Sequence, residues 1–97
     1  VTIYYGGDLD PEGICIADRL WQTYGDVIQM WRMSPKDYWV GISQEVLNDT
    51  RLAKMEHIKN PLLQQTAKCI YVRKKAAYQE NLLEKLLEDL TTEQTMT

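Results

Sequence analysis

The sequence lacks a long apolar run, and this absence excludes one class of protein. Apolar residues make up 44% of the 97 residues and charged residues 26%, which is an ordinary globular composition. No stretch approaches the roughly 18 consecutive apolar residues that a membrane-spanning helix needs. No signal peptide opens the chain. We therefore expect no membrane partner.

An excess of basic residues is also missing. Eleven Lys and Arg residues stand against 14 Asp and Glu residues, which gives a formal net charge of −3. Free-standing nucleic-acid-binding domains usually carry a basic excess, because the release of counterions drives much of their affinity. If this chain acts on nucleic acid, we expect other domains of the full-length protein to supply the binding.

Soft metal ligands are few. Cys15 and Cys69 are far apart and form no C-x-x-C pair, and His57 is the only histidine. A zinc site is therefore not expected. We interpret both cysteines as reduced, small apolar residues in a cytoplasmic protein.

The first third of the chain has a β-α-β pattern. Residues 1–5 are an apolar run typical of a strand buried on both faces of a parallel sheet. Asp10 is expected to cap a helix that begins at Pro11 and ends before Gly25. Residues 26–33 are expected to form a second strand, parallel to the first. Two strands are too few for an α/β core, so the missing strands are expected upstream.

The rest of the chain is predicted to be mainly helical. In order, the pattern predicts a turn at 34–37, an irregular apolar segment at 38–42, a short helix to about residue 58, a helix from Pro61 through Ala67, and a long helix at 76–90. Ser43 and Asn48 are both candidate caps of the short helix. Residues 69–72 fit either a strand or a continued helix. Residues 91–97 are expected to be a disordered polar tail.

Two carboxylates stand close together after the first strand. Asp8 and Asp10 are separated by one residue, so in an extended backbone both side chains point to the same side. Ligands of open α/β sheets bind beyond the carboxyl ends of the strands. Two hard oxygen ligands suit Mg²⁺ or Mn²⁺, and such an ion can polarise a phosphoryl oxygen. The spacing therefore predicts a divalent metal site.

The glycines beside this pair support the same interpretation. Gly7 and Gly13 let the backbone approach a bulky anion closely, and the N–H groups at the start of the helix can face a phosphate. Asp, Gly and Pro are also the usual residues of any β-to-α turn, where Asp10 only caps the helix. Asp8 is not needed as a cap, and two unpaired carboxylates repel each other unless a cation is bound. These two points favour the metal site.

Two blocks of the sequence resemble a known family. Residues 7–13, Gly-Asp-Leu-Asp-Pro-Glu-Gly, resemble the Asp-x-Asp-Pro-x-Gly motif of Toprim domains in the topoisomerase VI A subunit and its meiotic relatives. They are more similar to the Toprim-like C-terminal domains of uncharacterised bacterial proteins of the Wadjet (JetD-like) type. There the turn precedes an Ile-Ala-x-Arg-Leu-like helix, here at 16–20, and a Tyr-(Gln/Glu)-Glu segment, here at 78–80, precedes a Leu-rich helix.

The resemblance implies an α/β, three-layer Toprim-like domain with parallel strands, of which residues 1–90 are the C-terminal part. It implies Mg-dependent (or Mn-dependent) cleavage or transfer at nucleic-acid phosphodiesters. Asp8 and Asp10 match the metal ligands, and Glu80 matches a further acidic residue that we take as catalytic. Toprim domains also carry a Glu on an earlier strand, which has no counterpart here. The segment alone is therefore expected to be inactive, with the upstream half of the domain as its partner; a homodimer stays open.

Other functions and residues remain candidates. The same fold can serve as a non-catalytic interaction or dimerisation module, or the chain can be a phosphate-binding domain with a receiver-like fold, although it lacks the phosphoacceptor strand. Asp37 follows the second strand and is a weaker candidate for the same sheet edge. A solvated basic cluster is expected at Lys68, Arg73, Lys74 and Lys75, a solvated acidic face at Glu84 and Glu88, and core positions at Trp21, Trp31 and Trp39.

Overall fold

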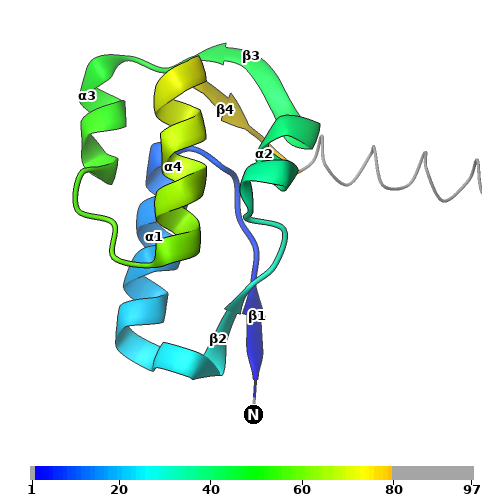
Figure 1. Ribbon diagram of the computed structural model, residues 1–97, viewed down its shortest axis with the longest axis vertical. Coiled ribbons are helices and arrows are strands. Elements are labelled where there is room, and N and C mark those ends of the chain that lie inside the picture. Colours follow the sequence, from blue (N-terminus) through cyan, green and yellow to red (C-terminus); the bar gives the residue numbers. More distant parts are fainter. Residues whose placement is uncertain (1, 80–97) are drawn as a thin grey trace, which may run out of the picture.

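The computed structural model describes residues 2–79, which form a small α/β unit (Figure 1). The elements in chain order are β1 (Ile3–Tyr5), α1 (Pro11–Tyr24), the 3-10 turn η1 (Gly25–Val27), β2 (Ile28–Met30), α2 (Pro35–Gly41), β3 (Ile42–Val46), α3 (Asp49–Leu52), the 3-10 turn η2 (Ala53–Met55), α4 (Pro61–Arg73) and β4 (Lys75–Ala77). Helices α1 and α4 pack together, and two small sheets lie at different ends of this pair (Figure 1).

The first sheet confirms the predicted β-α-β unit. Strands β1 and β2 pair in parallel, with Ile3 opposite Ile28. The second strand is shorter than expected, because residues 25–27 form a 3-10 turn. The side chains of Ile3 and Tyr4 are 48% and 70% exposed. Within the described residues β1 is therefore not covered on both faces, as a parallel strand normally is.

Helix α1 begins and ends where the sequence predicts. Asp10 is the N-cap in extended conformation, and its Oδ1 accepts a hydrogen bond from the Gly13 N–H. Pro11 occupies the first helical turn, where its missing N–H costs nothing. Gly25 ends the helix with a φ of 60°, in the region that favours glycine.

Helix α2 was not expected, since residues 34–37 were interpreted as a turn and 38–42 as irregular. Ser34 and Asp37 form a capping box, in which each side chain bonds to the other residue's backbone N–H. This arrangement satisfies two amides at the helix start and favours helix over turn. The buried ring of Tyr38 then anchors α2, and its hydroxyl donates to the Lys75 carbonyl at 2.6 Å.

The later elements correct three further boundaries. Of the two candidate caps, Asn48 caps α3, whereas Ser43 lies in β3 and donates to the Ala76 carbonyl. Residues 69–72 continue helix α4, which ends at Lys74 in left-handed conformation. Ala76 and Ala77, predicted as the start of the long helix at 76–90, instead lie in β4 (Lys75–Ala77), which is antiparallel to β3. Burial of Ala76 and Ala77 between neighbouring elements outweighs the helix propensity of alanine.

The core is aliphatic and contains one fully buried aromatic ring, that of Tyr38. The expectation that the tryptophans are core residues was wrong for two of them, since Trp31 and Trp39 are 39% and 44% exposed. Trp21 is half-buried. Leu and Ile side chains from α1, α3, α4 and the turn after β1 fill the interior instead, together with Met33 and Met55. Within residues 2–79, no helix combines the length and the apolar character needed to cross a bilayer.

Candidate functional site

Residues 7–13, the acidic turn, connect the end of β1 to the start of α1. Leu9 lies at the centre of the turn and is only 3% exposed. Its backbone pairs with Ala77 of β4 through two hydrogen bonds, 2.7 Å from the Leu9 N–H and 3.0 Å to the Leu9 carbonyl. Asp8 and Asp10 flank this buried residue, so the alternation of an extended backbone directs both away from the core position of Leu9.

The Asp10 carboxylate is half-buried and serves as a helix cap. Its Oδ1 accepts the Gly13 N–H at 2.7 Å. Its Oδ2 lies 3.9 Å from the guanidinium of Arg51. Burial raises the pKa of the Asp10 carboxyl, and the negative charges of Glu12 and Asp8 raise it further. The Gly13 hydrogen bond and the Arg51 charge oppose this rise in pKa.

The Asp8 carboxylate is also used by the fold. Its Oδ1 accepts a hydrogen bond from the backbone N–H of Gln79 at 2.9 Å. Asp10 and not Asp8 caps α1, as expected. The Asp8 side chain has a different structural role, because it holds the start of the segment after β4. Asp8 is exposed to solvent, unlike Asp10. The two predicted metal ligands thus differ in burial and each binds one backbone amide.

Tyr5 is a member of the site that the sequence reasoning did not single out. Burial raises the pKa of its phenol, and the charges of Asp10 and Asp8 raise it further. The negative charges of Asp8 and Asp10 therefore both affect the same phenol, at the end of β1. Gly7 lies under the same ring, since a Cβ at residue 7 would stand 3.0 Å from the Tyr5 hydroxyl. The sequence could have indicated Tyr5, because it is the last residue of the first strand, directly before the glycines and the acidic turn.

Arg51 of α3 joins the acidic side chains around the turn. Its guanidinium donates two hydrogen bonds to Glu12, from Nε at 2.9 Å and from Nη2 at 3.1 Å. Nη1 also lies 3.6 Å from a Glu45 carboxylate oxygen. The hydrogen bond from Arg51 is the main cause that lowers the pKa of the Glu12 carboxyl. No local signal marks Arg51, because it stands 39 residues from Glu12 in the sequence.

The glycines predicted to face a phosphate have structural roles in the described residues. A Cβ on Gly13 would meet the carbonyl oxygen of Asp8, so this turn requires glycine. The Gly13 amide already donates to Asp10. Gly7 lines a narrow recess together with Arg32 and Asp37, and this recess does not admit a water-sized molecule. Asp37 therefore does lie beside the acidic turn, but its carboxylate is engaged by Ser34.

The remaining predicted residues fall outside this site. Glu80, predicted as catalytic, and the acidic face at Glu84 and Glu88 lie outside the described residues. Within residues 2–79, no group of three or more His, Cys, Asp or Glu side chains is arranged to hold a metal ion. His57 is exposed, and both cysteines are free thiols.

Comparison with known proteins identifies the family. Residues 1–90 match the family described as "Protein of unknown function C-terminus (DUF2399)". The chain belongs to this family. The description of the DUF2399 family names no activity and no Toprim protein, so the Toprim resemblance stays a prediction. No curated protein and no solved structure matches the chain.

Proposed function

We propose that the chain is the metal-binding half of a Toprim-like domain that supports Mg-dependent cleavage or transfer at nucleic-acid phosphodiesters. The observation that carries this proposal is the placement of Asp8 and Asp10 on either side of the buried Leu9, in the turn beyond β1. Both carboxylates act on the Tyr5 phenol, and the Asp8 charge also raises the pKa of Asp10. A divalent cation between them would relieve this repulsion.

The donor set fits Mg²⁺ or Mn²⁺ in one particular way. Asp8 and Asp10 each use Oδ1 for a backbone amide, and we propose Oδ2 of each as a cation ligand. Mg²⁺ is commonly held by one or two carboxylates and completes its shell with waters and substrate phosphates. The bound ion would supply charge stabilisation at a phosphoryl oxygen. Glu80 and a glutamate from an upstream strand are the proposed further acidic groups.

The upstream half of the domain is the proposed partner of β1. Ile3 and Tyr4 are exposed on a parallel two-stranded sheet, and such a sheet is normally buried on both faces. A strand from the preceding part of the protein would cover this surface and extend the sheet. Nucleic-acid binding by other domains, a cytoplasmic location and a homodimer belong to the same proposal.

The alternative function is a non-catalytic interaction or dimerisation module. One observation favours it: each aspartate already satisfies a backbone amide, at Gly13 and at Gln79. In this reading the acidic turn only stabilises the fold.

A metal titration separates the two functions. The melting temperature of the chain is measured with increasing Mg²⁺ or Mn²⁺, and then for Asp8→Asn with Asp10→Asn. An amide oxygen still accepts the Gly13 and Gln79 hydrogen bonds, so the substitutions remove charge and keep the caps. A ligand at 100 times its Kd stabilises the native state by about 2.7 kcal/mol. We expect this stabilisation in the original chain and its loss in the double variant.

The matched control is Asp26→Asn, which removes one exposed carboxylate at η1, far from the turn in sequence. It should respond to Mg²⁺ as the original chain does. The interaction module would be favoured if Mg²⁺ raised the melting temperature of the double variant as much as that of the original chain. It would also be favoured if Mg²⁺ left the melting temperature of the original chain unchanged.

A further inference from the structure

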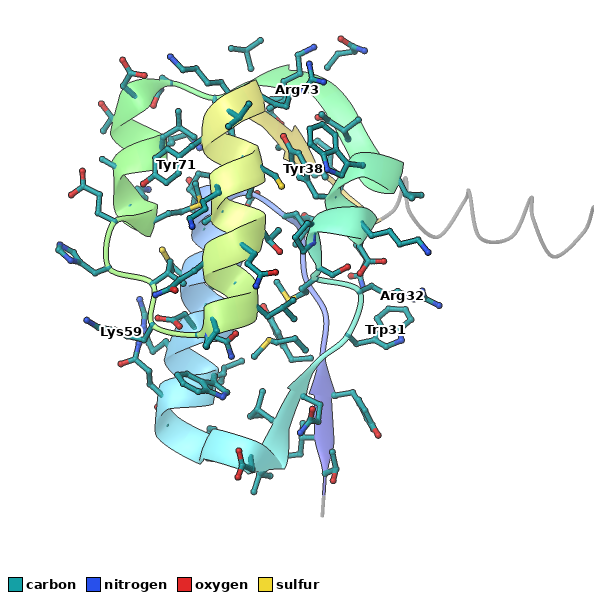
Figure 2. All side chains as sticks on the ribbon, in the orientation of Figure 1. Trp31, Arg32, Tyr38, Lys59, Tyr71 and Arg73 are labelled. Atoms are coloured by element: carbon teal, nitrogen blue, oxygen red, sulfur yellow. The ribbon has the colours of Figure 1, made fainter. Side chains whose placement is uncertain are left out.

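Two Trp–Arg pairs and a lysine gather around helix α2. The guanidinium of Arg32 lies 5.7 Å from the ring centre of Trp31. The guanidinium of Arg73 lies 5.0 Å from the ring centre of Trp39. Figure 2 shows Trp31 and Arg32 on the loop that leads into α2, and Arg73 at the end of α4. We name these four residues and Lys36 the α2 surface.

The α2 surface combines exposed rings with positive charge. Trp31 and Trp39 are 39% and 44% exposed, although tryptophan usually contributes to cores. Lys36 is exposed and stands three residues before Trp39, so both lie on one face of α2. Its acidic neighbour Asp37 is only 15% exposed and is hydrogen-bonded to Ser34. Asp37 Oδ1 also lies 4.0 Å from Nη1 of Arg32 and partly neutralises that charge. Lys36 and Arg73 add exposed positive charge near α2, in a chain whose net charge is −3.

We infer that the α2 surface binds single-stranded nucleic acid. Exposed aromatic rings stack on unpaired bases, and arginine and lysine contact the phosphates between them. Helix α2 has seven residues and is therefore about 10 Å long. This length spans about three stacked nucleotides at about 3.4 Å each. Trp31 lies on the loop four residues before the start of α2, so a strand that reaches both tryptophans must extend beyond the start of the helix.

The α2 surface also touches Tyr5 and Gly6, which lie directly before the acidic turn. The Trp31 N–H donates to the Tyr5 carbonyl at 2.8 Å. A Cβ on Gly6 would lie 2.8 Å from the Trp31 carbonyl and 2.9 Å from its ring. A strand stacked on Trp31 would thus run beside Asp8. This last step rests on the proposed function; binding by the α2 surface does not.

The test measures binding without metal. A short fluorescent oligothymidylate is titrated with the full chain in EDTA, and anisotropy is recorded at several salt concentrations. Trp39→Ala should weaken binding about tenfold. Lys36→Gln with Arg73→Gln should lower the slope of log affinity against log salt by about 1.4, or about 0.7 for each lost phosphate contact. Both positions are exposed, so this second variant should keep the fold.

Matched controls remove an exposed aromatic ring, or two exposed positive charges, at positions outside the α2 surface. Tyr24→Ala deletes a ring that is 56% exposed at the end of α1, and Arg19→Gln with Lys68→Gln removes two exposed charges from α1 and α4. All of these should bind as the original chain does. The inference is overturned if the original chain does not bind in EDTA, if the charge controls lose as much affinity as the α2 variant, or if Trp39→Ala changes only self-association in gel filtration.

The same assay separates this inference from the metal site. Asp8→Asn with Asp10→Asn should bind the oligonucleotide in EDTA as well as the original chain. That result, with no Mg²⁺ effect on melting, would remove the proposed function and keep the α2 surface. Loss of oligonucleotide binding in this double variant would count against the α2 surface.

Discussion

The carbonyl oxygen of Asp8 occupies the space that a Cβ atom on Gly13 would need. The first turn of α1 is therefore folded tightly against the acidic turn. Asp10 also contacts Gly13, because its Oδ1 accepts a hydrogen bond from the Gly13 N–H. Glycine at position 13 is thus required by the turn itself, whether or not a phosphate binds there.

Gly13→Ala should therefore destabilise the chain strongly. The added methyl group forces either the Asp8 backbone or the helix start to move, and such overpacking costs about 3 kcal/mol. Urea denaturation measures the loss. Gly25→Ala is the matched control, because Gly25 has a φ of 60° but no atom within 4 Å of the added Cβ. Gly25→Ala should lower the free energy of unfolding only by the strain of the left-handed conformation, about 1–2 kcal/mol. Equal losses would contradict the steric argument.

Asp18 should be a second sensitive position. It is 3% exposed, and its Oδ1 accepts the backbone N–H groups of Lys59 and Asn60 at 3.0 and 2.8 Å. Asp18→Ala leaves these donors without their acceptor, so we expect a loss of about 2–4 kcal/mol in the free energy of unfolding. Asp18→Asn keeps one acceptor oxygen and should lose less. A loss from Asp18→Ala as small as that from the exposed control Asp26→Ala would contradict this role.

Arg51→Gln should change metal binding more than stability. The partners of Arg51 are well exposed, at 41% for Glu12 and 45% for Glu45, so we expect a loss below about 1 kcal/mol. The substitution also removes a cation that lies 3.9 Å from Asp10 Oδ2. We therefore expect Mg²⁺ to bind a few times more tightly, measured by the shift in melting temperature.

The control for this variant is Lys54→Gln. Lys54 also pairs with Glu12, at 3.4 Å, so its removal leaves the Arg51–Asp10 contact in place. Its Mg²⁺ affinity should change less. Weaker Mg²⁺ binding by Arg51→Gln would mean that Arg51 positions Asp10 and does not compete with the cation.

Tyr38 should make stability fall at alkaline pH. Burial is the main cause that raises the pKa of its phenol, followed by the Cys69 thiol. The folded state therefore holds this proton more tightly than the unfolded chain. Its contribution is complete below the unfolded pKa of about 10 and is lost as the pH rises through the folded pKa. Tyr38→Phe should reduce this alkaline loss, measured by denaturation at several pH values.

The same variant should cost stability at neutral pH. Without the hydroxyl, the Lys75 carbonyl loses a hydrogen bond of 2.6 Å, worth about 1 kcal/mol. Tyr24→Phe changes an exposed ring and should alter neither quantity. Part of the alkaline loss should remain in Tyr38→Phe, because the pKa of Tyr5 and that of Tyr71 are also raised. An unchanged alkaline profile would remove Tyr38 as the main cause.

The parts of the fold that depend on local signals were predictable. Asp10, Pro11 and Gly25 mark both ends of α1 by residue type, and the structure confirms them. The parallel pairing of β1 and β2 followed from the single helix that connects the two strands. Helix α2 was missed although its signal was local, because Ser-Pro-x-Asp begins turns as well as helices. Neighbouring burial, with Tyr38 inside the core, decides between the two.

The surroundings of the acidic turn were not predictable, because they come from distant segments. Arg51 reaches Glu12 across 39 residues, and the Gln79 amide reaches Asp8 across 71. Nothing in the pattern near residues 7–13 indicates these contacts. Ala76 and Ala77 were assigned to the start of a helix at 76–90, but Ala77 pairs with Ile42 of β3 and with Leu9.

The pairing of Leu9 with Ala77 has a consequence for the order of folding. The turn is synthesised before the strand that holds it, which follows almost seventy residues later. Because the pairing of Leu9 with Ala77 closes a large loop, we expect it to form after the local helices have formed. A nascent chain that stalls before Lys75 carries both aspartates without the strand that fixes their geometry. If the turn binds a metal ion, that binding would depend on β4 as well as on the two aspartates.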